Sequence, residues 1–285
     1  MIYSRIRGGL GNQLFQYSVA RSLADRLNTD LGLDTRDYDH HSPYSVGLKN
    51  FNIRAEYNPP CMIRHKKDGI IRYMVDIALF KHKNVYKEPH LYFDKNVYSL
   101  PDKSYLKGYW QSEKYIEKNK TNILNDLTIT NLQSFQNKRI SEKIADTKSV
   151  SLHIRRGDYV SNTAYNVTHG TCSLSYYKNA INHLIKKIGE DFTVFAFSDD
   201  PEWVLSNLKL PVDIQFITNN SSEHNYEDLR LMSECKHNII ANSSFSWWGA
   251  WLNTNPNKII IAPSKWYSDN KTKNIDIIPS NWVKI

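Results

Sequence analysis

FTVFAFSDDP, residues 192–201, joins an unbroken apolar run to a helix start, and this junction decides the fold class. An unbroken apolar run such as residues 192–197 is typical of a strand that is buried on both faces. Asp200 is a suitable helix N-cap, and Pro201 suits the first helical position. Strands of this kind, each followed by a helix, indicate a parallel sheet with helices on both sides.

The same alternation extends on both sides of this junction. Upstream, Val150–Ile154 reads as a strand, and a helical stripe from Tyr177 to Ile188 ends at Gly189. Downstream the pattern predicts strands over 214–218, 238–241 and 258–262 and helices over 225–235 and 245–252. The second half is therefore predicted to be a doubly wound parallel sheet.

Polar sequences follow the predicted strands of this sheet. They are RRGD (155–158), SDD (198–200), TNNSS (218–222) and NSSFS (242–246). Sheets of this type bind ligands beyond the carboxyl ends of their strands, so these side chains are expected to line one shared crevice.

The first half is less regular. A strand over Ile2–Ile6, a GGLGN turn and an amphipathic helix up to Leu27 are followed by a loop-like stretch over 34–60. We expect helices over 69–82 and 112–126 and a strand in SYLKGYW (104–110). The polar stretch 130–147 is the best candidate for a linker, which gives lobes of 1–140 and 141–285.

The composition of the 285 residues is that of a globular protein, with 40% hydrophobic residues and a net charge of +8. The positive charge favours an anionic partner: a nucleotide, a nucleic acid or an acidic membrane face. Cys61, Cys172 and Cys235 are too far apart for a zinc motif or a disulfide framework. No secretory signal or long apolar segment is evident, so we expect a cytoplasmic protein.

HIRRGD (153–158) places two arginines at the end of a buried strand. An unpaired guanidinium is costly in a low-dielectric interior, and a diphosphate is a partner that the guanidinium fork binds with two hydrogen bonds. The alternatives are an ordinary surface loop in which Asp158 pairs with an arginine, and an RGD adhesion signal, which would need secretion.

The serines of ANSSFSWWGAW (241–251) precede a predicted helix. Free backbone N–H groups and hydroxyls at a helix start favour phosphate, whereas ordinary capping is the alternative. The tryptophans of this segment are expected to fill the core.

Three further patterns are weaker. Asp199 is free to accept a hydrogen bond from a guanine edge or a ribose hydroxyl. GGLGNQ (8–13) suggests a dinucleotide fingerprint but lacks its third glycine, since Leu14 stands there. Asp37 and Asp39, before two histidines, resemble a manganese-binding pair but have no supporting carboxylates, so no metal is expected.

Five motifs occur together in this chain: GGLGNQLFQY (8–17), GYWQSEKY (108–115), HIRRGDY (153–159), FAFSDDPEWV (195–204) and SSFSWWGAWL (243–252). In this combination and order they resemble glycosyltransferase family 11, the α-1,2-fucosyltransferases, of the bacterial cytoplasmic kind. The resemblance implies a GT-B-like α/β fold of two Rossmann-like lobes. It also implies transfer of fucose from GDP-L-fucose, bound mainly by the second lobe, with inversion and without a metal or other cofactor.

The resemblance extends to the core α-1,6 and protein O-fucosyltransferases and implies roles for individual residues. Arg155 is expected to bind the β-phosphate, His153 and Asp199 to lie at the guanosine end, and Arg156 and Asp158 to brace the loop. Asn12 is a candidate for the reaction centre. The other expected donor contacts are Arg156, Ser243, Ser244, Phe245, Ser246, Gly9 and Gly11, and the expected acceptor contacts are Gln13, Tyr109, Trp110 and Gln111.

The general base is open on sequence grounds. YVSNTAY (159–165) lacks the glutamate that the core α-1,6 enzymes carry near this motif. Asp158, Asp34, another carboxylate of the first half, or the departing phosphate could accept the proton.

Several alternatives concern substrates and partners. The family suggests a terminal β-galactoside acceptor, in bacteria often a lipid-linked repeat unit such as an O-antigen precursor, with peripheral contact to an anionic membrane. The runner-up function is a different linkage or a different GDP-sugar. A basic nucleic-acid-binding or lectin-like protein is the alternative from another class, but no element carries an aromatic and basic stripe, so nucleic acid is not expected.

Overall fold

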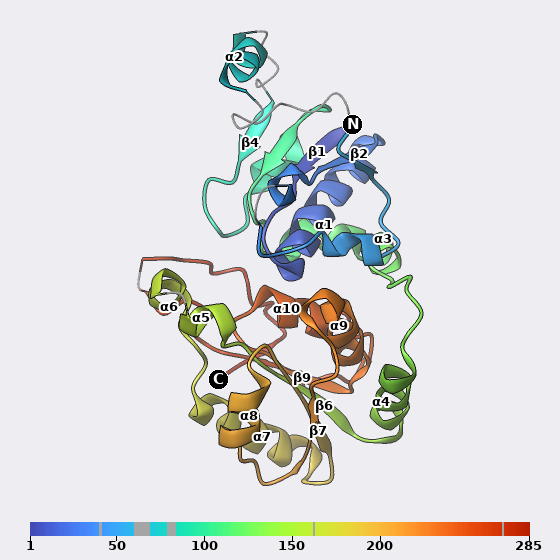
Figure 1. Ribbon diagram of the computed structural model, residues 1–285, viewed down its shortest axis with the longest axis vertical. Helices are drawn as coiled ribbons and strands as arrows, with labels where there is room; N and C mark the ends of the chain where they lie inside the picture. The colour runs from blue at the N-terminus through green and yellow to red at the C-terminus, as the bar shows by residue number, and fades with distance from the viewer. Residues whose placement is uncertain (40–41, 60–68, 79–83, 162, 270) are drawn as a thin grey trace. The chain divides into compact units, whose positions relative to one another are not determined.

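The computed structural model describes residues 1–39, 42–59, 69–78, 84–161, 163–269 and 271–285. The chain forms two compact units, residues 1–128 and 129–285, each with its own parallel sheet (Figure 1). The division falls after Thr128 rather than near residue 140, because α4 (Phe135–Asp146) packs against α9 (Asn225–Glu234) of the second unit.

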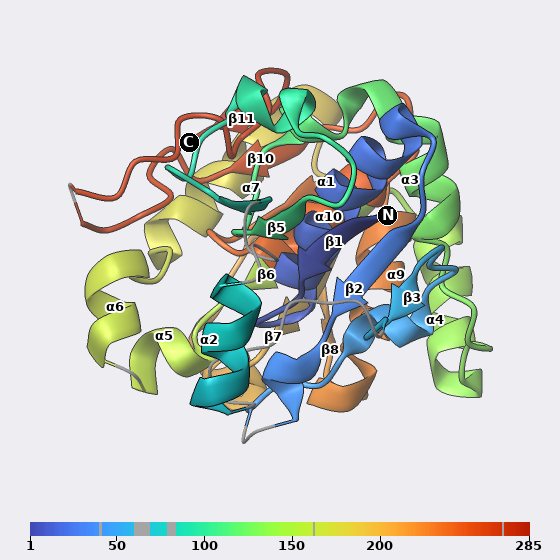
Figure 2. The same ribbon diagram turned by 90° about the horizontal axis from the view of Figure 1, so that it is seen from above.

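The first unit contains a five-stranded parallel sheet in the order β3-β2-β1-β5-β4, of which Figure 2 shows β5, β1, β2 and β3. Its strands are β1 (Ile2–Arg5), β2 (Leu31–Asp34), β3 (Glu56–Tyr57), β4 (Val85–Lys87) and β5 (Tyr105–Lys107), and its helices are α1 (Leu10–Leu27), α2 (Ile70–Ala78) and α3 (Lys120–Asp126). Helix α1 packs on β1 and β2. Residues 13–20 are all buried, so the helix is covered on every side up to Ala24 rather than amphipathic as the sequence predicts.

The first unit differs from the sequence prediction in three places. The stretch 34–60 is not only loop, because Gly32 and Leu33 of β2 pair with β3. Residues 112–126 do not form one helix: two 3₁₀ turns, Glu113–Tyr115 and Glu117–Asn119, precede the short α3. The GGLGN sequence is only partly a turn, since α1 already begins at Leu10.

The second unit contains a six-stranded parallel sheet in the order β11-β10-β9-β6-β7-β8. Its strands are β6 (Ser149–Ile154), β7 (Thr193–Ser198), β8 (Asp213–Ile217), β9 (His237–Ile239), β10 (Ile260–Ala262) and β11 (Val283–Lys284). Besides α4 and α9, its helices are α5 (Gly157–Ser161), α6 (Thr163–His169), α7 (Leu174–Ile188), α8 (Pro201–Asn207) and α10 (Ser244–Leu252). The predicted doubly wound sheet is confirmed.

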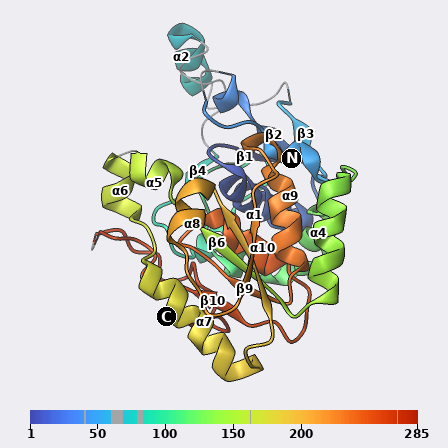
Figure 3. The same cartoon turned by 60° about the horizontal axis from the view of Figure 1, so that its bottom comes forward.

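Strand β7 shows why this sheet is covered on both sides. Val194 and Ala196 face one core with α7 and α8, whereas Phe195 and Phe197 face a second core with α4 and α9. Figure 3 shows these two helix pairs on opposite sides of the strands. Asp200 caps α8 by accepting a hydrogen bond from the Trp203 N–H, with Pro201 at the helix start, as the sequence predicts.

The order of strands in each sheet identifies the edge where ligands bind. In the second sheet the chain runs outward from β6 through β7 to β8 and then returns to β9 on the other side of β6. Parallel sheets bind ligands beyond the carboxyl ends of the strands at such a switch point. The first sheet has the corresponding point between β1 and β5. None of the helices in the described ranges is long and apolar enough to cross a membrane.

Candidate active site

The carboxyl end of β6 carries two of the predicted site residues, His153 and Arg155. The His153 side chain is buried, and its Nδ1 atom has no hydrogen-bond partner among the described residues. Burial, with a smaller contribution from the Arg155 charge, lowers the pKa of His153 to about 3. His153 is therefore a neutral ring at physiological pH, with a polar atom available for a hydrogen bond.

Asp199 holds the Arg155 guanidinium at this edge. One carboxylate oxygen lies 3.0 Å from the Arg155 Nη1 atom, and the other accepts a 2.8 Å hydrogen bond from the Arg156 backbone N–H. Gly157 makes room for this arrangement, because a Cβ atom there would lie 2.4 Å from the Asp199 carboxylate. The Arg155 side chain is 23% exposed. The guanidinium is therefore held in one orientation and is still accessible from solvent.

Arg156 has a different environment. Its Nε atom lies 3.0 Å from Asp200, and its guanidinium stacks 3.6 Å from the centre of the Trp203 ring. Both contacts are with α8 and its cap, so Arg156 braces the loop after β6.

The start of α10 lies across the switch point, after β9. Ser243 is the N-cap, and its hydroxyl accepts a hydrogen bond from the Phe245 N–H. The first turn of any α-helix has N–H groups without intrahelical acceptors, and its positive dipole end favours anions. Ser244 and Phe245 are partly exposed, whereas Ser246 is buried and donates to the Ser243 carbonyl, 3.3 Å away.

Direct contacts join the two sides of this switch point. The His153 and Phe245 rings lie 5.7 Å apart. Arg155 lies over the Tyr159 ring at 5.4 Å, and the Tyr159 hydroxyl donates to the Asn242 carbonyl at 3.3 Å. The structure thus brings a fixed cation and a serine-capped helix start to the same edge of the sheet. This arrangement suits a phosphate group.

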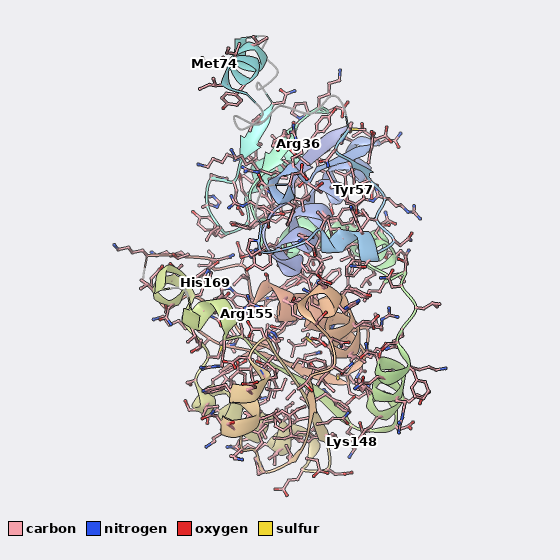
Figure 4. All side chains as sticks on the ribbon, viewed as in Figure 1. Arg36, Tyr57, Met74, Lys148, Arg155 and His169 are labelled. Atoms are coloured by element: carbon pink, nitrogen blue, oxygen red, sulfur yellow. The ribbon has the colours of Figure 1, made fainter. Side chains whose placement is uncertain are left out.

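Two residues that complete this edge were not assigned roles on sequence grounds. Tyr159 links Arg155 to the turn before α10 and stacks on His169, with their rings 4.9 Å apart; Figure 4 shows Arg155 and His169. The Asn242 amide donates to the carbonyls of His169, Gly170 and Trp266. The signal for both was their position inside the HIRRGDY and ANSSFS motifs.

The switch point of the first unit carries two of the predicted acceptor residues, Tyr109 and Gln111, in a partly exposed position. The Gln111 amide donates to the Asn12 side-chain oxygen at 2.8 Å. Arg7, which sequence reasoning did not single out, is exposed and lies over the Tyr109 ring at 5.7 Å. The left-handed residue of the preceding turn is Gly8, at φ +79°. Gly9 is the extended residue before α1, and Gly11 is buried within the helix.

Gln13 and Trp110 are buried beneath the partly exposed residues of this switch point. Gln13 is buried, and its amide group donates to the Gly8 and Ser45 carbonyls and accepts from the Gly47 N–H. Trp110 is also buried and packs edge-on against Tyr115. Both residues were predicted to contact the acceptor, and in this structure they support the residues that are partly exposed.

Glu88 fixes the turn that carries Tyr109 and Gln111. Its two carboxylate oxygens accept hydrogen bonds from the backbone N–H groups of Tyr109, at 2.7 Å, and Trp110, at 2.9 Å. Trp110 has a left-handed backbone, with φ +59°, which is unfavourable for a bulky residue. Burial raises the pKa of Glu88 above its usual range, although the two N–H bonds oppose this change.

The other carboxylates suggested by the sequence have protein partners or lie outside the description. Asp34 is fully buried and binds the Arg36 guanidinium and the Tyr105 hydroxyl, so both of its carboxylate oxygens have protein partners. Asp37 pairs with Arg5 through two hydrogen bonds. Asp158 lies in α5, and its side chain is outside the described part; His40 and His41 are also outside it.

The chain has a GT-B-like fold of two α/β units, each with a parallel sheet. A family model described as "Glycosyl transferase family 11" matches residues 62–285. The chain belongs to this family, and it is therefore a glycosyltransferase; membership also rules against the alternative of a simple nucleic-acid or glycan-binding protein.

Two relatives from Escherichia coli match over their full length. The chain is 34% identical over 302 residues to an alpha-1,2-colitosyltransferase, covering 100% of this chain and 99% of the relative. It is 32% identical to the O-antigen biosynthesis glycosyltransferase WbnK, covering 100% of both. A solved structure of a variant of Arabidopsis thaliana FUT1 in complex with GDP is 9% identical, with a TM-score of 0.51, over 92% of this chain and 70% of that one. The last similarity concerns the fold alone.

Proposed function

We propose that this glycosyltransferase transfers L-fucose from GDP-β-L-fucose to the 2-hydroxyl of a terminal β-galactoside, with inversion and without a metal ion. The single observation that carries the proposal is the Arg155 guanidinium, which Asp199 holds at the switch point and which Tyr159 and Asn242 connect to the start of α10. In an inverting transfer the acceptor oxygen forms a bond to the anomeric carbon while the bond to the β-phosphate oxygen breaks. The hydroxyl proton goes to a base.

The second unit supplies what the leaving group needs. Negative charge grows on the β-phosphate as the sugar becomes oxocarbenium-like, and a guanidinium fixed beforehand stabilises that charge without reorganising. The positive end of α10 acts in the same direction. His153, as a neutral buried ring beside Phe245, is assigned to the guanosine end.

The first unit carries the residues assigned to the acceptor and the reaction centre. Asn12 and Gln111 present amide groups, and Tyr109 presents a ring, a combination common where proteins bind sugar hydroxyls and the apolar faces of sugar rings. The acceptor proposed is a glycan or an O-antigen-type repeat unit. This choice is consistent with the name of the 32% identical relative.

A second donor has a specific observation in its favour. The 34% identical relative is named for colitose, a sugar that differs from L-fucose only by lacking one hydroxyl group. A hydrogen-bonding group in the donor pocket would distinguish the two sugars, because a buried polar group left without its partner costs about 1–3 kcal/mol.

The test is a donor and acceptor panel. The protein is incubated with GDP-fucose or GDP-colitose and a set of β-galactosides in the presence of EDTA, and NMR then identifies the linkage. We expect an α-1,2-linked fucoside with metal removed. A product formed only with GDP-colitose would show that the donor is GDP-colitose and not GDP-fucose. A linkage to another hydroxyl would contradict the proposed α-1,2 linkage. A thermal shift with GDP but none with UDP or NAD would support the nucleotide.

A further inference from the structure

Helix α2 presents an apolar face to solvent. Ile70, Ile71, Met74 and Val75 are 57%, 77%, 57% and 46% exposed and together line one open apolar depression. Positions i, i+1, i+4 and i+5 of an α-helix share one face. Figures 1 and 3 show α2 apart from the strands of the first sheet, and Figure 4 labels Met74 on it.

This concentration distinguishes α2 from the rest of the described chain. The other exposed large apolar residues there are spread over separate elements: Leu132, Phe135, Val160, Val167, Leu205 and Ile275. Single exposed apolar residues are normal in soluble proteins, whereas a contiguous patch marks an interaction surface. The apolar face of α2 is therefore expected to bind another molecule.

The sequence around α2 identifies the charge that the occupant must carry. Residues 62–87 contain seven Lys and Arg residues against two Asp residues, a net charge of +5 out of the +8 of the whole chain. An apolar helix face with cations close to it in sequence is typical of segments that bind anionic bilayers, because apolar side chains enter the headgroup boundary and cations meet lipid phosphates.

Geometry favours a position on the surface of the bilayer. The nine described residues of α2 extend about 14 Å, about half the hydrocarbon thickness of a membrane, so this described segment is too short to span one. A second copy of this chain is a poorer occupant, because two segments of the same strong positive charge would repel each other. Charge complementarity thus selects an anionic lipid surface.

We propose that α2 is an interfacial membrane-binding helix, which inserts its Ile70, Ile71, Met74 and Val75 face into an anionic phospholipid bilayer. The proposal does not depend on the identity of the donor or the acceptor. It assigns the membrane contact to one helix rather than to the general positive charge of the protein.

The experiment compares two matched double variants of the full chain. I71E/M74E removes two apolar residues from the α2 face, whereas L132E/F135E removes two that are even more exposed, at 97% and 80%, in the second unit. Both variants change the net charge equally. Binding is measured by co-sedimentation with vesicles of phosphatidylcholine, with or without 30% phosphatidylglycerol, at low and high salt.

We expect the wild type and L132E/F135E to bind the phosphatidylglycerol vesicles, more weakly at high salt, and I71E/M74E to bind at least about tenfold more weakly. All three proteins should have the same melting temperature, because the substituted side chains are exposed. The proposal is overturned if the wild type stays in the supernatant with anionic vesicles, or if the two variants bind alike. It is also overturned if sedimentation shows a dimer that only I71E/M74E dissociates.

Discussion

The two sheets share a topological feature, a switch point in the strand order, but carry different side chains at it. In both, the strand order reverses beside the first strand, and that point collects the polar side chains. The second unit places Arg155, His153 and the capped start of α10 there. The first unit places amides and an aromatic ring there, Asn12, Gln111 and Tyr109. A parallel sheet therefore fixes where a ligand binds, whereas the loop residues determine which ligand.

Arg155 gives the strongest test of this difference. We expect Arg155→Ala to lower kcat by about 10²–10³ with the fold intact, because the growing phosphate charge loses its fixed cation. Arg155→Lys should not rescue transfer, since an ammonium group cannot make the two parallel hydrogen bonds of a guanidinium. Steady-state kinetics with circular dichroism as the folding control measures both. A lysine variant with most of the wild-type activity would contradict the assignment.

Gly157→Ala tests whether the position of Asp199 matters. The new Cβ atom would lie 2.4 Å from the Asp199 carboxylate, so Asp199 must move and release Arg155. We expect GDP to bind about tenfold more weakly, a cost typical of a small overpacking. Calorimetric titration of GDP measures it. Unchanged affinity would show that Asp199 is not needed to orient the guanidinium.

Asn12→Ala is the corresponding test of the first unit. It removes the amide assigned to the reaction centre and leaves the Gln111 amide without its acceptor. A loss of about 1 kcal/mol of transition-state stabilisation predicts about a fivefold decrease in kcat/KM for transfer. The affinity for GDP should not change, in contrast to Gly157→Ala. If Asn12→Ala weakened GDP binding as strongly, the division of labour between the two switch points would be wrong.

The smallest expected effect concerns His153, whose ring should not take up a proton in the physiological pH range. Since the folded pKa is about 3, the His153 resonances in an NMR pH titration should not move between pH 5 and pH 8. The lowered pKa also affects stability: the folded form is penalised as the pH falls below about 6.5, because only unfolded His153 takes up a proton. His153→Gln should reduce this acid destabilisation. A resonance that titrates near pH 6.5 would show that His153 is not buried in solution.

Periodicity and capping residues were enough to predict the second sheet. The unbroken apolar run of β7 predicts a strand that is buried on both faces. In the structure Val194 packs in one hydrophobic core and Phe195 in another. Asp200 and Pro201 specify the start of α8 through local backbone geometry, which needs no distant contact. The first unit was predicted less well, because its 3₁₀ turns and the two-residue β3 have no such periodic signal.

The sequence by itself determined which chemistry is available: the arginines after β6, the serines before α10 and the amides after β1 and β5 follow from local motifs. Only the tertiary structure decided how each is used. Arg155 is held at the edge by Asp199, 44 positions along in sequence, whereas its neighbour Arg156 is stacked on Trp203 and faces α8. Adjacent residues can differ in this way because contacts between distant segments, absent from any local pattern, decide which side chain is buried, paired or presented.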